Sequence, residues 1–155
     1  MSDALSDALS DAQQQARVLF AEAQRLQSAH DIPASVALTR RALVLDPGFV
    51  EAIEHLATVL ITRQRRNAEG LELIERAVAL RPDDAGLWYS LGWCYEFAAH
   101  ELARRPPAVV VLQPRALYER AADAFRRCLA LHPEGKLLDD SEDLLDHVEN
   151  ELRSL

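Results

Sequence analysis

The sequence predicts an all-α solenoid of three helical hairpins, and three observations lead to this fold class. The chain has only 5 Gly and 7 Pro in 155 residues and is rich in Ala, Leu, Glu and Arg, which favour helix. A seven-residue word that ends an amphipathic helix at a proline occurs three times: RALVLDP (41–47), RAVALRP (76–82) and RCLALHP (127–133). A second helical pattern precedes each word. Because one such hairpin cannot bury its own apolar face, the copies must stack.

Each hairpin has small residues where its two helices must approach one another. Large residues one turn away would fill the space beside these contacts. The small positions on the first helices are Ala23, Ala57 and Gly92, and those on the second helices are Ser35, Gly70 and Ala121.

The third copy carries the most specific pattern in the chain. Its residues are Trp88, Leu91, Gly92 and Tyr95, followed by Ala121, Phe125 and Pro133. This run resembles the tetratricopeptide repeat, whose pattern is W-x2-L-G-x2-Y, then A-x3-F, then P. The second copy keeps the spacing with aliphatic residues, and the first is weaker because Glu22 stands where an apolar residue is usual. The resemblance implies a right-handed superhelical solenoid with repeats at 16–49, 50–84 and 85–135.

The N-terminal residues 1–15 form an extension with the word SDAL in tandem. Apolar residues at 4-3-4-3 spacing run from Leu5 through Leu9 to Leu26, which is the seam spacing of paired helices. The extension is therefore either a flexible tail or a lengthening of the first helix, and in the second case it offers a surface for a partner or a second copy.

The third repeat contains an insertion around residues 100–116. Pro106 and Pro107 must end the first helix, and Pro114 is well placed to begin the second, so we expect a taller hairpin joined by a loop over 106–113. The apolar run 109–112 in this loop either tucks back onto the solenoid or forms a contact surface.

Residues 136–155 predict a C-terminal capping helix. Leucines and Val148 share one face and acidic residues occupy the other, as a terminal helix needs in order to cover the last repeat and remain solvated.

Composition excludes several classes of function. A net charge of −8 argues against nucleic acid, because phosphate binding needs a basic face. The longest aliphatic run, AVVVL, is far shorter than the roughly 20 residues that cross a bilayer. The N-terminus lacks a signal-peptide pattern, and two cysteines give no disulfide framework, which together indicate a cytoplasmic protein.

Neither catalysis nor a cofactor is indicated by the pattern of reactive residues. The five histidines are scattered without metal-ligand spacing, and the chain has no phosphate-cradling glycine loop and no recognisable nucleophile context. We therefore expect no catalytic residues, no metal, no cofactor and no enzyme activity.

The cluster DDAGLWYSLGWCYEF (83–97) concentrates the aromatic residues of the chain. The resemblance implies that the first helices of successive repeats line a concave groove. The candidate groove residues, selected by helical phase, are Phe20, Gln24, His55, Thr58, Ile61, Tyr89, Trp93 and Phe97. The alternative is that the insertion or the C-terminal helix covers the aromatic stripe permanently.

The resulting hypothesis is a non-enzymatic module that binds a peptide or helix of another protein, as adaptor, scaffold or assembly chaperone. Family members that hold the tails of large cytosolic chaperones use Lys, Asn and Arg along the groove, and this chain lacks the asparagines, so that specific role is not expected. The alternative function is a self-associating structural oligomer, such as a homodimer, built through the N-terminal helix or the Val-rich insertion.

Overall fold

The computed structural model describes residues 9–107 and 112–155, which form seven helices and no strand. This confirms the all-α prediction. The helices are α1 (Asp11–Ser28), α2 (Ile32–Leu45), α3 (Val50–Gln64), α4 (Asn67–Leu80), α5 (Ala85–Arg104), α6 (Pro114–Ala130) and α7 (Gly135–Ser154).

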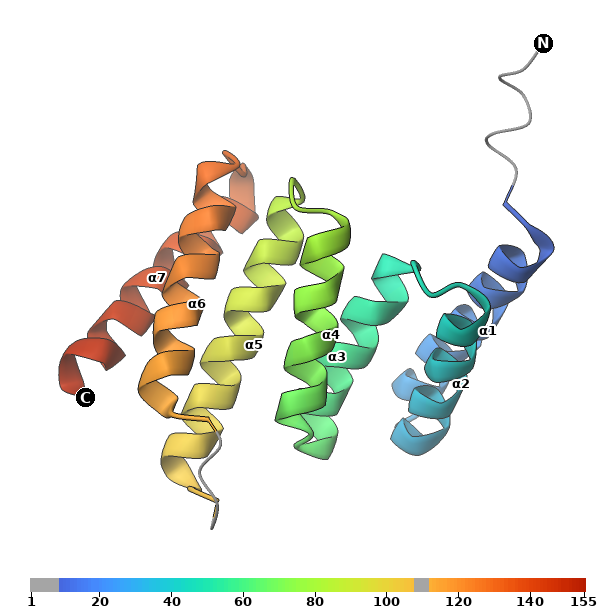
Figure 1. Cartoon of the computed structure of the whole chain (residues 1–155), viewed down its shortest axis with the longest axis horizontal. Helices are drawn as coiled ribbons and strands as arrows, with labels where there is room; N and C mark the ends of the chain where they lie inside the picture. Colours follow the sequence, from blue (N-terminus) through green and yellow to red (C-terminus); the bar gives the residue numbers. More distant parts are fainter. Residues whose placement is uncertain (1–8, 108–111) are drawn as a thin grey trace.

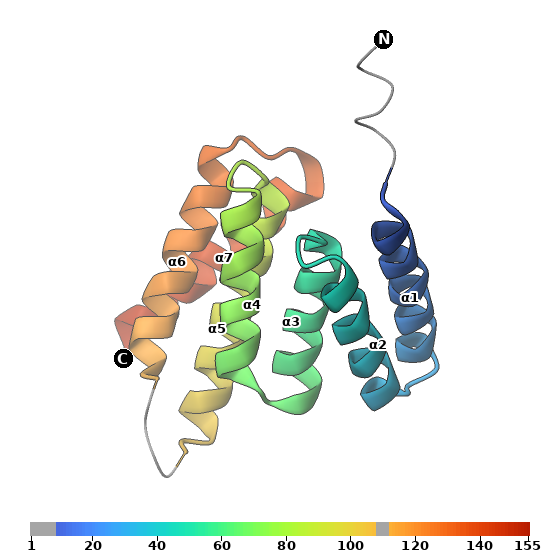
Figure 2. The same ribbon diagram turned by 45° about the vertical axis from the view of Figure 1, so that its right-hand side comes forward.

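Three antiparallel hairpins, α1–α2, α3–α4 and α5–α6, follow one another along the molecule, and α7 closes the C-terminal end (Figure 1). The second helix of each hairpin packs on the first helix of the next, so that α2 contacts α3 and α4 contacts α5. The turned view in Figure 2 shows the same order, with α1 and α7 at opposite ends of the row. The arrangement is the predicted solenoid.

The small residues of each hairpin lie where the helices meet, as predicted, and all six are buried. At Gly92 an added Cβ would lie 2.7 Å from Phe125, and at Gly70 it would lie 2.5 Å from Ile61. A methyl group does not fit at either distance, so glycine sets the approach of α5 to α6 and of α3 to α4.

The first helix begins at Asp11, five positions before the expected repeat boundary. Ser10 starts it with a capping box, in which the Ser10 hydroxyl accepts from the Gln13 backbone N–H and the Gln13 side chain accepts from Ser10 N–H. Ala16 and Ala23 of the 4-3-4-3 seam are fully buried within the hairpin. That part of the seam is therefore the packing face of α1 rather than a free surface, while Leu5 lies outside the described residues.

The third hairpin has the longest first helix, the 20-residue α5, and the longest second helix, the 17-residue α6. Pro114 is the first residue of α6. A backbone N–H at this position would have no partner within the helix, so proline costs no helical hydrogen bond there. Leu112 is half-buried against the main core. Residues 109–111 of the Val-rich run lie outside the described residues.

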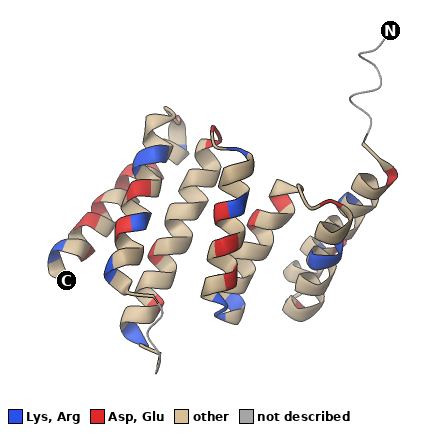
Figure 3. Ribbon diagram, viewed as in Figure 1, with Lys and Arg blue, Asp and Glu red and all other residues tan. Residues whose placement is uncertain are grey.

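The terminal helix α7 packs mainly on α6 and also touches α5. Val148 is fully buried, and the Ser141 hydroxyl lies 3.3 Å from the thiol of Cys128. Across the α6–α7 boundary, Arg126 forms an ion pair with Glu149 at 3.0 Å. Figure 3 shows acidic residues along α7 and few charges along α5, with the charged α6 between them in this view. One face of α7 thus covers the last repeat while the other is charged, as a cap requires.

Candidate partner-binding groove

Two adjoining hollows of about 320 Å³ each run across the first helices of the hairpins. The first lies between α1 and α3, and the second lies between α3 and the start of α5. They adjoin at Glu51 and Glu54, which line both. Four of the predicted site residues line the first hollow: Phe20, Gln24, His55 and Thr58. We call these two adjoining hollows the groove.

The charge of the groove is acidic. Glu51, Glu54 and Asp84 line it, against the single guanidinium of Arg81. Arg81 pairs with Glu51 at 2.9 Å. Burial acts to raise the pKa of Glu51, but hydrogen bonds from its own backbone N–H and from Arg81 outweigh this effect and hold the pKa below 4.5. Glu51 is therefore ionised at neutral pH.

The Glu54 carboxylate sits deeper in the groove than the Glu51–Arg81 pair. It accepts a hydrogen bond from the Ser90 hydroxyl and has no ion-pair partner among the described residues. Its negative charge is therefore not neutralised by any cationic side chain among the described residues.

His55 places a polar atom with no partner in the floor of the groove. Its Nε2 is buried and makes no hydrogen bond within the described part of the chain. The ring lies edge-on to Phe20, with ring centroids 5.2 Å apart. Burial lowers the pKa of His55 below 6.5, because a buried imidazolium loses hydration that nothing nearby replaces. The neutral imidazole thus leaves one enclosed ring nitrogen without a hydrogen-bond partner among the described residues.

The aromatic stripe on α5 lies beside the two hollows and not inside them. Tyr89, Trp93 and Phe97 are half-buried, and all three pack on the main core. Trp93 and Phe97 stack on each other with centroids 5.5 Å apart. Burial, and next the Asp140 carboxylate of α7, raise the pKa of Tyr89, so the Tyr89 end of the stripe faces α7.

One predicted groove residue needs correction, and another contributes less surface than expected. Ile61 is only 1% exposed and packs under Gly70 in the core, so it is not a groove residue. Ile61 comes three residues after Thr58, and because each residue turns the helix by about 100°, its side chain points toward α4. The next residue, Thr62, is half-buried. Phe20 is 8% exposed and contacts Phe49 edge-on, so it mainly serves the core and presents little surface to a ligand.

Asp84 and Arg81 were missed because they do not lie within the first helix of any hairpin. Asp84 precedes α5 and caps it by accepting from the Leu87 backbone N–H at 3.2 Å. Arg81 follows α4. Counting along the first helices could not find them, but the connection between α4 and α5, residues 81–84, which begins within the second proline word, enters the groove and would have indicated them.

Among the described residues, no helix has the length and apolarity that crossing a membrane requires. Within the same residues, no group of His, Cys, Asp and Glu side chains is placed to hold a metal ion. Cys94 and Cys128 are free and buried, and burial raises the pKa of the Cys94 thiol to about 12, which keeps it protonated and unreactive.

No protein-family model and no curated protein sequence matches the chain. Solved structures do resemble it. The first TPR domain of Spaghetti (RPAP3), bound to an HSP90 peptide, superposes with a TM-score of 0.69 at 17% identity, covering 91% of this chain and 95% of that one. The Arabidopsis OM64 TPR domain gives 0.64 at 15% identity, covering 88% and 98% of the two chains.

The N-terminal domain of stress-induced protein-1 from C. elegans gives a TM-score of 0.60 at 15% identity, again covering 88% of this chain and 98% of that one. These superpositions extend over nearly the whole chain and agree with the repeat pattern read from the sequence. The chain therefore has the tetratricopeptide-repeat fold, as three hairpins followed by a C-terminal helix.

Proposed function

We propose that the protein is a non-enzymatic, cytoplasmic interaction module that binds an extended or helical segment of another protein in the groove. The carrying observation is the groove itself, two adjoining hollows across α1, α3 and α5 in which the buried His55 Nε2 has no hydrogen-bond partner and the Glu54 carboxylate has no ion-pair partner among the described residues. Unsatisfied polar groups of this kind favour a ligand that completes their hydrogen bonds.

The charge of the groove supports a basic partner segment. The peptide in the RPAP3 structure, SRMEEVD, has three acidic residues and one basic residue. Here three carboxylates and one guanidinium line the groove, so a segment with Lys or Arg gains attraction that an acidic tail would lose. A groove of this charge would also repel acidic chaperone tails, which the chain is not expected to hold.

The aromatic stripe supports an apolar anchor beside the basic residues of the partner. Trp93 and Phe97 are half-buried neighbours on α5, the helix that also borders the second hollow. Tyr and Trp residues often contribute most of the binding energy of an interface. A segment that bears basic residues near one large apolar side chain would meet both features.

The proposal is tested by selecting random 16-residue segments, displayed on phage, on the immobilised full chain. We expect enrichment of segments with net positive charge and a large apolar residue. Binding of the enriched peptides should fall at least tenfold in Glu54→Lys, which reverses the free carboxylate. The matched control is Glu72→Lys, the same change at an exposed position of α4 outside the groove.

Three outcomes would contradict the proposal. The first is enrichment of acidic segments, the second is failure to enrich any segment, and the third is equal loss of binding in Glu54→Lys and Glu72→Lys. The third outcome would indicate that only the net charge of the whole protein matters.

A further inference from the structure

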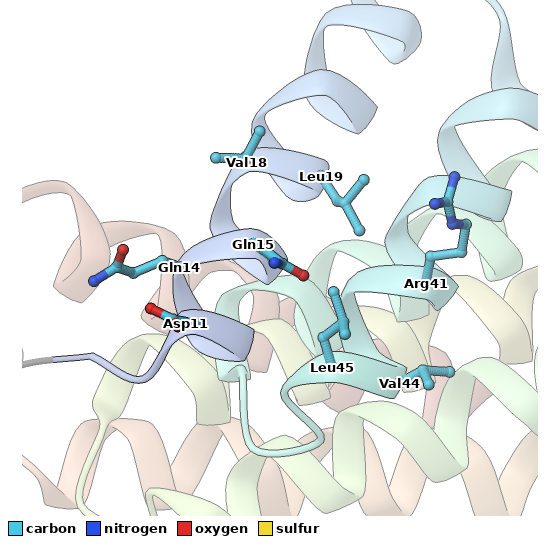
Figure 4. A pocket seen from close by; sticks show the side chains of 8 residues that line it. All are labelled: Asp11, Gln14, Gln15, Val18, Leu19, Arg41, Val44 and Leu45. Carbon is cyan, nitrogen blue, oxygen red and sulfur yellow. The ribbon is translucent and has the colours of Figure 1, made fainter.

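An open pocket of about 700 Å³ lies at the free end of the first hairpin, away from the groove. Figure 4 shows its lining, which comes entirely from α1 and α2. Val18 is 69% exposed and Val44 is 80% exposed, and Leu19 and Leu45 lie between them and the hairpin interior. Large apolar side chains exposed together in this way mark an interaction site.

The repeat register shows what kind of surface this is. Val18 immediately precedes the first pattern position of its repeat, and the equivalent residues of the next two repeats are Ala52 and Leu87. Ala52 is 0% exposed and Leu87 is 3% exposed, because a preceding hairpin covers each of them. No described helix covers Val18 in this way. The α1 part of the surface is thus a stacking face without its stacked neighbour, whereas Val44 on α2 lies outside that face, since its equivalents Ala79 and Ala130 are exposed too.

Only the half of this face near the start of α1 is apolar. Further along the helix, Glu22 and Arg25 form an ion pair at the register positions where the second repeat buries Leu56 and Val59. A complete further hairpin would have to bury that ion pair, which is unfavourable. The open area therefore suits a partner that covers the apolar half alone.

Two opposite charges border the pocket, and neither is compensated. Asp11 and Arg41 both line it, and neither forms an ion pair or side-chain hydrogen bond with any described residue. An acidic or a basic ligand would satisfy one of them and repel the other. A second copy of the same face satisfies both, because a two-fold axis between them sets Asp11 of each copy opposite Arg41 of the other.

We propose that two copies of this chain pair through the α1–α2 end faces about a two-fold axis, with Val18 and Val44 in the contact and two Asp11–Arg41 ion pairs at its border. This surface is separate from the groove, which uses the opposite side of α1, so the proposal stands independently of the proposed function. Both grooves stay open in the dimer. The contact involves half of one hairpin end, which places it among small, concentration-dependent interfaces.

The test is sedimentation equilibrium of the full chain from 1 to about 200 μM, a range that spans the dissociation constants of small interfaces. We expect a reversible monomer–dimer equilibrium. Asp11→Arg alone and Arg41→Asp alone should each raise the dissociation constant at least tenfold, because like charges then face each other. The double variant with both changes should restore pairing, which a folding defect could not do.

Val18→Glu should also abolish the dimer, and the matched control Leu80→Glu, at a residue 48% exposed on α4, should leave it unchanged. Circular dichroism confirms that each variant is folded. A chain that is monomeric throughout overturns the proposal, and so does a dimer that is indifferent to the single charge reversals or not restored by the double change.

Discussion

Gly92 and Phe125 together set how closely α5 and α6 approach. Phe125 is fully buried, and its ring atoms occupy the space that a Cβ on Gly92 would need. The same relation holds at Gly70, where the added atom would also lie 2.9 Å from the Ala57 carbonyl oxygen. These contacts are local, so they can be tested by single substitutions.

We expect Gly92→Ala to lower the free energy of unfolding by about 1–2 kcal/mol. Overpacking a core costs about 1–3 kcal/mol, and the better helix propensity of Ala returns about 1 kcal/mol at most. The measurement is urea denaturation followed by circular dichroism. Gly86→Ala is the control in the same helix, since its Cβ would meet only the movable Asp84 side chain, at 3.2 Å. Equal stability of the two variants would contradict the packing account.

The buried His55 predicts a specific dependence of stability on pH. Because burial holds its pKa below 6.5 in the folded state, the unfolded chain binds the proton first as the pH falls. This contribution to the free energy of unfolding is complete above about pH 6.5 and is lost as the pH drops toward the folded pKa. Denaturation curves between pH 7.5 and 5 measure it.

We expect His55→Gln to show a smaller loss of stability over that pH range than the unsubstituted protein. His100→Gln, at an exposed histidine of α5, is the control and should follow the unsubstituted curve. If His55→Gln loses stability as steeply as the unsubstituted protein, then the imidazole is not desolvated as the structure indicates.

Among the helices, α7 is the one whose packing on the rest of the fold is most easily tested. It is bound by the fully buried Val148, by the half-buried Leu144, Leu145 and Leu152, and by the Arg126–Glu149 ion pair. A terminal helix that covers the core of the last repeat should contribute to the stability of the whole array.

We expect Val148→Ala to reduce the free energy of unfolding by about 1–3 kcal/mol, because it removes buried carbon atoms and leaves a cavity. Leu155→Ala is the control, since Leu155 is 60% exposed and should change stability little. Thermal and urea unfolding of the two variants make the comparison. A neutral Val148→Ala would mean that α7 is only loosely attached to α6.

The helices themselves were well predicted from the sequence, and the reason is that their ends are marked locally. Pro114 begins α6 and Asp84 caps α5, and both signals are visible in the sequence. Side-chain orientation on each helix was less predictable. Ile61, three residues after its groove neighbour Thr58, points only about 60° away from it around the helix axis, and contact with Gly70 decides which way it faces.

At the scale of the whole molecule, the fold could be inferred because the same packing rule recurs in each repeat. Identity with solved TPR domains is 15–17%, yet the small and bulky positions suffice to stack three hairpins. The acidic groove was harder to predict, because it combines residues of α3 with the connection between α4 and α5. Such juxtapositions arise only when the hairpins stack.

The central claim is that another polypeptide lies in the groove formed by α1, α3 and α5. Site-specific photo-crosslinking in the native host tests it most directly, with benzoylphenylalanine placed at Thr58 in the groove or at Glu72 on the outer helix α4. We expect Thr58 to crosslink to one segment of a partner, which carries basic residues and a large apolar residue, and Glu72 to give no such product. Equal products at both positions, or none at Thr58, would contradict the claim.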